Sequence, residues 1–141
     1  MEQQSVTLTP YLSFEGNCEE ALNFYSEIFQ GKVEVVNRYD NPAMKAPAEY
    51  REKVLHAYIT FGAVTMYASD VFPGKRAHKS SGDMALSLDF SEVETAKKVF
   101  EQLSEEGETG VLFAKQFWGD WHGNLIDRYG IRWMINVTER A

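Results

Sequence analysis

Two stretches of this chain repeat one pattern of strand, helix and three further strands, which restricts the folds open to it. The helical stretches superpose at a shift of about 75 residues, which pairs the apolar positions Cys18, Ala21, Phe24, Tyr25 and Ile28 with Val93, Ala96, Val99, Phe100 and Leu103. The hairpins FGAVTMYAS (61–69) and YGIRWMINV (129–137) share an aromatic residue, a glycine and a methionine at one spacing. Agreement of element order, apolar stripe and hairpin predicts a tandem duplication of one small module.

The first module is expected at about residues 8–70. Its predicted elements are a strand at 8–14, a helix between Asn17 and Gly31, a strand at 33–39, a long loop at 40–53, and a hairpin of strands at 54–61 and 64–69. Loops as long as the one at 40–53 are often functional or mobile. The segment 70–82, which carries Pro73 and Gly74, is the one convincing internal linker.

The second module is expected at about residues 82–138. A strand at 83–90 precedes a helix at 92–106, for which Ser91 is the predicted N-cap and Glu94 the capping-box residue. Three strands are then expected at 111–118, 122–127 and 131–137. Asp127 and Gly130 fit a turn in which the carboxylate caps backbone amides and the glycine takes a positive φ.

The predicted fold class is α+β, a single domain over residues 1–141 in which two βαβββ modules form an eight-stranded open cup with the helices outside. The alternation of side chains along a strand then selects the residues that face the cup. They are expected to be His56, Tyr58, Thr60, Val64, Met66 and Ala68 in the first module and Arg132, Met134 and Asn136 in the second. Their neighbours, Trp133 among them, are expected to pack under the helices.

Charge and cysteine content exclude several classes of partner. The formal net charge of −7 disfavours nucleic acid and anionic membranes, which need a cationic surface, and suits a neutral or cationic small ligand. No apolar run reaches the length of a membrane span, which is about 18 residues or more. The lone Cys18 gives no intrachain disulfide and the N-terminus shows no signal-peptide pattern, so we expect a cytoplasmic protein.

Several motifs resemble the PhnB-like branch of the glyoxalase/bleomycin-resistance family, the vicinal oxygen chelate proteins. They are NCEEALNFYSEIFQGK after the first strand and QFWGDWHGNLIDRYGIRWMINV at the end of the chain. The likeness covers nearly the whole chain, and its terminal FWGDxxGxLxDxxGxxWxI pattern is the most specific part. The resemblance implies paired βαβββ modules. PhnB-like domains often carry a demethylubiquinone methyltransferase label, but no glycine-rich phosphate loop or visible S-adenosylmethionine site supports it here.

The resemblance also implies where a metal would bind in the metal-dependent relatives, which use four His or Glu ligands from the first and last strands of each module. Aligned by the repeat, those positions fall on Pro10 (or Tyr11), Met66, Asp83 (or Met84) and Met134. One carboxylate cannot replace three or four such ligands. We therefore predict no metal and no other cofactor, and an emptied cup suited to an organic ligand.

The three histidines and Arg132 differ in where they are expected to lie. His56 is expected to face the cup, although a hydrogen-bonded structural histidine is the more frequent case. His122 is the better titrating candidate, and His78 is expected to be solvent-exposed. Arg132 in the cup would need a partner, for which Asp83 or a ligand anion are candidates.

The densest run of functional chemistry is Phe117, Trp118, Asp120, Trp121 and His122. Its rings and carboxylate could contact a ligand at the edge of the cup, or could form a β-bulge whose rings seal it. Both interpretations stay open on the sequence.

The leading hypothesis is a metal-free module that binds a small organic molecule and works as a homodimer. The first alternative is a metal-dependent lyase or dioxygenase of the glyoxalase type that uses His56, His122 and Asp83. A third is a structural or regulatory dimer with a filled cup. Whether the protein is an enzyme stays open, with binding favoured over catalysis, and no catalytic residue is assigned.

Overall fold

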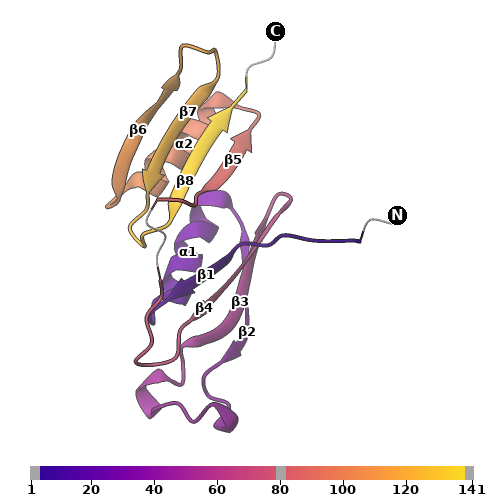
Figure 1. Ribbon diagram of the computed structural model, residues 1–141, viewed down its shortest axis with the longest axis vertical. Helices are drawn as coiled ribbons and strands as arrows, with labels where there is room; N and C mark the ends of the chain where they lie inside the picture. The colour runs from indigo at the N-terminus through magenta and orange to yellow at the C-terminus, as the bar shows by residue number, and fades with distance from the viewer. Residues whose placement is uncertain (1–3, 79–81, 139–141) are drawn as a thin grey trace. The chain divides into compact units, whose positions relative to one another are not determined.

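The computed structural model describes residues 4–78 and 82–138, and the chain divides into two compact units, Met1–His78 and Lys79–Ala141. Within the described residues, no helix is long and apolar enough to cross a membrane. Each unit holds one four-stranded sheet and one long helix, as Figure 1 shows. The predicted α+β class and the two βαβββ modules are confirmed.

The first module follows the order strand, helix, three strands. Its elements are β1 (Tyr11–Phe14), α1 (Cys18–Phe29), β2 (Lys32–Arg38), the short 3-10 helices η1 (Pro42–Met44) and η2 (Ala48–Tyr50), β3 (Val54–Phe61) and β4 (Val64–Asp70). The strands lie in the order β1-β4-β3-β2, with β1 parallel to β4 and the other pairs antiparallel. The last strand of the module, β4, therefore lies between β1 and β3.

The second module repeats this arrangement. Its elements are β5 (Leu86–Phe90), α2 (Val93–Ser104), β6 (Glu108–Lys115), β7 (Trp121–Ile126) and β8 (Arg132–Val137). The strand order β5-β8-β7-β6 is that of the first sheet, and β5 is again parallel to β8. The repeated topology confirms the duplication predicted from the helical stripes.

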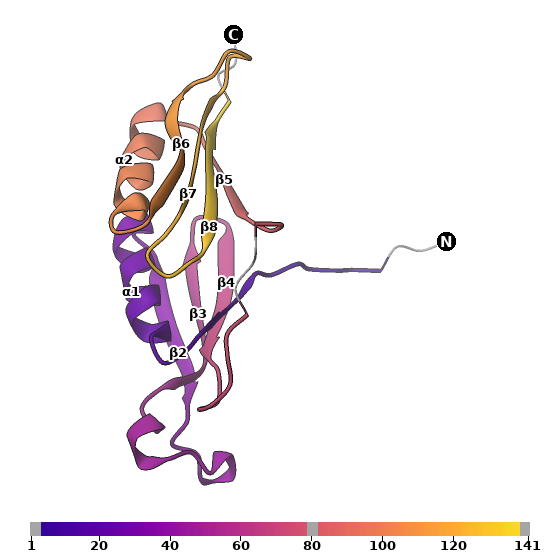
Figure 2. The ribbon, with the colours of Figure 1, turned by 60° about the vertical axis from the view of Figure 1, so that its left-hand side comes forward.

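Each helix covers one face of its own sheet and leaves the opposite face without a helix, as Figure 2 shows. The covered faces hold the cores of the modules. In the first, Cys18, Ala21, Leu22 and Tyr25 of α1 are fully buried, as are Ala57 and Ile59 of β3. In the second, Ala96 and Leu103 of α2 are buried with Trp133 and Ile135 of β8. Apolar burial on one face of each sheet therefore leaves the helix-free face available for other chemistry.

Several predicted boundaries need correction, among them that of the strand predicted at 83–90, which begins at Leu86. The first strand begins at Tyr11 and not at residue 8. Helix α2 has Glu92 as its N-cap, in an extended conformation and without a side-chain cap hydrogen bond, so the predicted capping role of Ser91 is wrong. Strand β6 ends at Lys115, because the chain turns at Phe117 and Trp118 before β7 begins.

The side-chain assignment on β4 was wrong for half of the first hairpin. The two-residue loop Gly62-Ala63 places Phe61 directly opposite Val64, and residues directly opposite in a hairpin share a face. Met66 therefore pairs with Ile59 on the side of the helix, where its side chain is only 1% exposed. Met66 and Ala68 belong to the core, and Tyr67 takes the helix-free face in their place.

The second hairpin follows the prediction. Trp133, Ile135 and Val137 are buried on the side of α2, and Met134 alternates with them on the helix-free face. Asp127 Oδ1 accepts from the backbone N–H groups of Tyr129 and Ile131 at 2.8 and 3.0 Å, and Gly130 has φ 85°. The predicted turn at Asp127 and Gly130 and the core position of Trp133 are confirmed.

Candidate functional site

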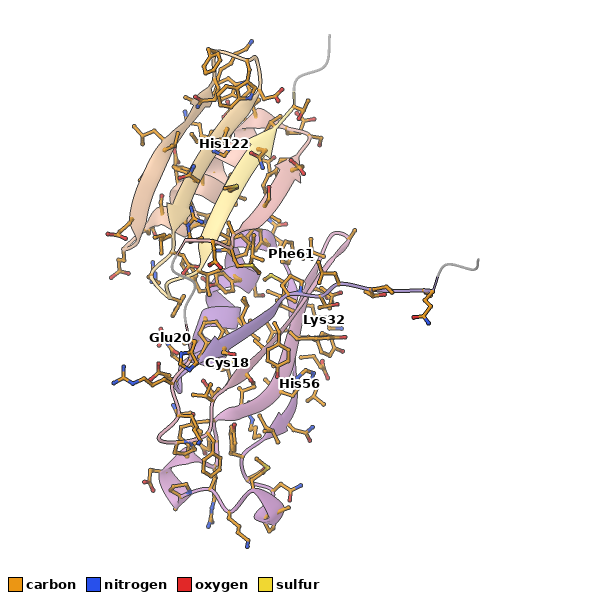
Figure 3. All side chains as sticks on the ribbon, viewed as in Figure 1. Cys18, Glu20, Lys32, His56, Phe61 and His122 are labelled. Carbon is orange, nitrogen blue, oxygen red and sulfur yellow. The ribbon has the colours of Figure 1, made fainter. Side chains whose placement is uncertain are left out.

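Three aromatic rings gather on the helix-free face of the first sheet. Tyr11 comes from β1, His56 from β3 and Tyr67 from β4; Figure 3 labels His56 on its strand. The Tyr11 and His56 rings stack with centroids 6.0 Å apart, and Tyr67 meets them at 6.3 and 5.3 Å in edge and tilted arrangements. We call these three residues the aromatic face.

The aromatic face is accessible from solvent. Tyr11 is 53% exposed and Tyr67 is 37% exposed, while His56 is half-buried between them. Tyr58 lies directly opposite Tyr67 in the β3–β4 pair, so its side chain points to the same side. Rings with exposed faces and phenolic hydroxyl groups can stack on a flat ligand and hydrogen-bond to its edge.

The helix-free face of the second sheet carries polar chemistry instead. Asn136 Nδ2 donates to the Leu88 carbonyl at 3.2 Å and to Ser87 Oγ at 2.9 Å. This orientation turns Asn136 Oδ1 toward His122, whose Nδ1 lies 2.7 Å away. Figure 3 shows His122 on the second sheet. Because Asn136 Oδ1 can only accept, Nδ1 of His122 must donate.

A second amide fixes the other ring nitrogen of His122. Asn124 Oδ1 accepts from the Val111 N–H at 3.2 Å, so Asn124 Nδ2 is the group that lies 3.1 Å from His122 Nε2. An amide N–H can only donate, and Nε2 must therefore accept. The two amides together favour the tautomer of His122 that carries its proton on Nδ1.

Arg132 and Met134 lie on this same face of β8, next along the strand from Asn136. Arg132 Nη1 donates to the carbonyls of Gly82 and Met84 at 2.8 and 3.3 Å. Backbone carbonyls that precede β5 are thus partners of Arg132, for which the sequence predicted Asp83 or a ligand anion. Asp83 lies exposed in that stretch.

The run from Phe117 to His122 is divided among three environments. Phe117 and Trp118 form the turn between β6 and β7, where Phe117 is 97% exposed and the two rings meet edge to face at 4.9 Å. Asp120 is half-buried, and its carbonyl accepts from Gln116 N–H across the turn. Trp121 lies opposite Val137 on the side of α2, away from His122. Trp121 and His122 thus point to opposite faces of β7.

The amino end of α1 is closed by a carboxylate that the sequence did not single out. Asp70, at the end of β4, is buried, and its Oδ1 accepts from the N–H groups of Gly16 and Cys18 at 2.8 and 2.9 Å. Its Oδ2 accepts from Val54 N–H at 2.9 Å. A helix amino end commonly binds anions, but here the chain's own carboxylate takes these donors.

An open polar cleft of about 840 Å³ lies beside this helix end, bordered by the loop before β3. Two of its charged side chains form an ion pair: Arg38 makes a two-point contact with Glu19 at 2.9 Å and also donates to the Glu52 carbonyl at 2.7 Å. The hydrogen bond from Arg38 holds the pKa of Glu19 below its usual value. The ion pair between Glu19 and Arg38 thus connects α1 to β2.

The donor groups on the helix-free faces do not suit a divalent metal ion. Of the residues that the structure describes, no three His, Cys, Asp or Glu side chains gather as a metal site needs. The residues that β1, β4, β5 and β8 present there include Tyr11, Tyr67, Ser87 and Met134, which are poor ligands for hard or borderline cations. The fold family's metal thus finds no matching donor set among these residues.

Sequence reasoning missed part of both faces. Tyr67 was hidden by the wrong face assignment on β4, and the two-residue turn at Gly62-Ala63 was the signal that could have corrected it. Asn124 was missed because its role depends on a bulge in β6, between Thr109 and Val111, that no pattern in the sequence marks.

Comparisons with known proteins agree with this architecture. The family model described as 3-demethylubiquinone-9 3-methyltransferase matches residues 6–136. Protein YjdN of Escherichia coli is 28% identical over 143 residues, which cover 94% of this chain and 96% of YjdN.

Solved structures extend the likeness. The crystal structure of protein PA1353 from Pseudomonas aeruginosa has a TM-score of 0.83 at 29% identity and covers 96% of this chain and all of its own. The PhnB protein from Bacillus cereus has a TM-score of 0.80 at 25% identity, over 94% of this chain and all of its own. A glyoxylase/bleomycin resistance protein/dioxygenase domain from Frankia shares the fold, with a TM-score of 0.69 at 12% identity over 99% of this chain and 96% of its own.

Proposed function

Because this chain belongs to the 3-demethylubiquinone-9 3-methyltransferase family, which includes PhnB-like proteins of the glyoxalase fold, we propose that it binds a small organic molecule without a metal ion. The observation that carries the proposal is the aromatic face of Tyr11, His56 and Tyr67. Exposed rings that cluster on a sheet without a covering helix are suited to hold a flat ligand.

The charge of the protein narrows the ligand class. At a net charge of −7, the molecule attracts cations and repels anions at low salt. A cation placed over an aromatic ring is also stabilised by the ring's negative face. The proposed ligand is therefore a flat heteroaromatic compound, neutral or cationic.

Neither the metal-dependent alternative nor the methyltransferase name gains support from the described residues. A metal-dependent lyase would need a ligand set that His56, His122 and Asp83 do not form within either module. Asp70 already occupies the helix end that follows β1 and that an anionic cofactor group would use.

Binding is tested with a panel of flat heteroaromatic compounds, neutral, cationic and anionic, by isothermal titration calorimetry. We expect saturable binding of cationic or neutral members, weakened about 5- to 30-fold by Tyr67→Ala, the equivalent of about 1–2 kcal/mol for one lost ring contact. Phe24→Ala is the matched control, because it removes a half-buried ring of α1, on the opposite side of the same sheet.

Two outcomes contradict the proposal. One is the absence of binding by any compound at millimolar concentration, and the other is equal weakening by Tyr67→Ala and Phe24→Ala. Elemental analysis of protein purified without chelator tests the metal-free part separately. A stoichiometric divalent ion would favour the metal-dependent alternative.

A further inference from the structure

A small hollow lies at one end of the second sheet. It has a volume of about 270 Å³, and its lining includes Glu108 and Gly110 of β6, Asn124 and Ile126 of β7, and Arg132 of β8. Figure 1 shows these three strands side by side in the order β6, β7, β8. The hollow therefore belongs to one module and is separate from the aromatic face.

The strand register places an acidic, an apolar and a basic side chain in one row across this end of the sheet. Glu108 pairs with Ile126, and Ile126 pairs with Arg132. Residues directly opposite in antiparallel strands point to the same side, and Arg132 lies on the helix-free face. Two strand spacings separate Glu108 from Arg132, so their backbones are about 10 Å apart.

The two opposite charges of this row do not neutralise each other. Arg132 Nη1 donates to the carbonyls of Gly82 and Met84, which precede β5, and β5 borders β8 on the side away from β7. These bonds hold the guanidinium away from Glu108. Within the described part of the chain, the ion pairs of this module belong to Arg128, and none joins Glu108 to Arg132.

A β-bulge opens the hollow on the side of β6. Gly110 is the extra residue of the bulge and has no partner in β7, so its backbone polar groups lie outside the ladder. A side chain at this position would collide with Asn124 Oδ1. The Asn124 amide is itself held by Val111 N–H at 3.2 Å and His122 Nε2 at 3.1 Å. The bulge therefore adds backbone polar groups and one oriented amide to the charged row.

We propose that this hollow binds a short, linear zwitterion of the ω-amino acid class, with its ammonium group at Glu108, its carboxylate at Arg132 and its carbon chain on Ile126. Both hydrogen bonds of Arg132 use Nη1, so Nη2 and Nε keep donors that can bind a carboxylate. The inference goes beyond ligand binding at the aromatic face and does not depend on it.

Charge and spacing select this ligand class over simpler ones. The net charge of −7 disfavours a simple anion, whereas a zwitterion has no net charge. In an α-amino acid one carbon atom carries both charged groups. Two protein charges whose backbones are about 10 Å apart instead match a molecule with several carbon atoms between its charged groups.

Titration followed by ¹H–¹⁵N NMR spectra at low salt tests the ligand class. The probes are 4-aminobutanoate, 5-aminopentanoate and 6-aminohexanoate, and the comparison compounds butanoate and butylamine carry one charge each. We expect at least one zwitterion to shift the amide signals of residues 108–111, 124–126 and 132 with saturation. Butanoate and butylamine should bind about 5-fold more weakly or less.

Charge-removing variants test the two ends of the site. Glu108→Gln and Arg132→Gln should each weaken binding of the best zwitterion by about 5- to 10-fold. Glu101→Gln and Lys98→Gln are the matched controls, because they remove the same charges from exposed positions of α2, and they should leave binding unchanged. Spectra with native-like dispersion establish that each variant is folded.

Three results would contradict the proposal. The first is that none of the zwitterions shifts these signals at tens of millimolar concentration. The second is that butanoate or butylamine binds as tightly as the best zwitterion, and the third is equal weakening by the site variants and their controls. If Arg132→Gln does not fold because its bonds to the backbone are lost, Glu108→Gln, at an exposed residue, still decides the outcome.

Discussion

At the scale of single residues, Cys18 shows how burial controls reactivity. It is fully buried in the first turn of α1, and removal from water, followed by the nearby Asp70 carboxylate, raises the pKa of its thiol. Since the thiolate is the reactive form, a thiol with a raised pKa and no access to solvent is inert. This is why a single cysteine in this chain need not signal nucleophilic chemistry.

We expect Cys18 to resist alkylation in the native protein and to react fully once the chain is unfolded in urea. Val36→Cys provides the control, because position 36 is half-exposed and should label within minutes under native conditions. Labelling is measured by intact mass. Labelling of Cys18 as fast as that of position 36 would contradict the buried position.

At His122, two backbone groups determine which ring nitrogen carries the proton, and they act through two amide side chains. The Leu88 carbonyl orients Asn136 and the Val111 N–H orients Asn124, and these two amides define the roles of both ring nitrogens. We expect long-range ¹H–¹⁵N NMR spectra near pH 7.5 to show the Nδ1–H tautomer for His122. In Asn136→Ala the Nδ1 position loses its acceptor, and the tautomer should move toward Nε2–H. An Nε2–H tautomer in the wild type would show that the amides are oriented otherwise.

At the scale of secondary-structure elements, one carboxylate joins three of them. Asp70 lies at the end of β4 and accepts from the start of α1 and from the first residue of β3. Tyr39 reinforces the junction by donating from its hydroxyl to the Asp70 carbonyl at 2.7 Å. The amino end of the helix is thus anchored to the sheet without a capping residue of its own.

Asp70→Asn should destabilise the protein by about 2–4 kcal/mol, because the amide puts a donor against at least one backbone N–H and removes the buried charge that these groups solvate. Asp40→Asn, on an exposed loop residue, is the matched control and should change the free energy of unfolding by less than about 0.5 kcal/mol. Urea unfolding measures both. Equal free energies of unfolding for the two variants would contradict the structural role of Asp70.

The Glu19–Arg38 ion pair joins α1 to β2 and should respond to pH in one direction. Its hydrogen bond from Arg38 lowers the pKa of Glu19, so the pair stabilises the fold above the ordinary glutamate range and loses that effect as the pH falls through the lowered value. Both side chains are partly exposed, which limits the gain to about 0.2–1 kcal/mol. Glu19→Gln should therefore cost that amount at pH 7 and nothing near pH 2, measured by urea unfolding. A cost that is the same at both pH values would contradict the ion pair as its cause.

How far the sequence predicts these elements depends on whether the signal is periodic or local. The helices and most strands follow from apolar spacing, because burial on one side of each sheet imposes that spacing. The face of β4 was wrong because one turn sets it, and the end of β6 was wrong because apolar Phe117 and Trp118 lie in a turn. For the site, His56, Tyr58 and Met134 were placed on the correct face. Tyr67, Asp70 and Asn124 were not found, since their roles arise from register, a bulge and contacts distant in sequence.

At the scale of the whole molecule, surface charge sets the class of partner. With 14 basic against 21 acidic residues, the chain carries an excess of negative charge, which opposes binding to phosphate backbones. We expect no shift of double-stranded DNA or RNA in electrophoresis at 50 mM salt, even with protein at micromolar concentration. Retention that weakens steeply with added salt would show a basic patch that the overall charge conceals.

Each module buries its core on the side of its helix and presents its exposed rings or amides on the opposite side. Substitutions on the open face therefore remove few core contacts, whereas those on the covered face affect folding directly. Mutations can accumulate at positions such as Tyr11 or Ser87 at little risk to the scaffold. The two modules share one topology, yet the first presents an aromatic face and the second an amide-rich face. A scaffold of this kind is evolvable, and it offers an engineer two independently adjustable surfaces in a single chain.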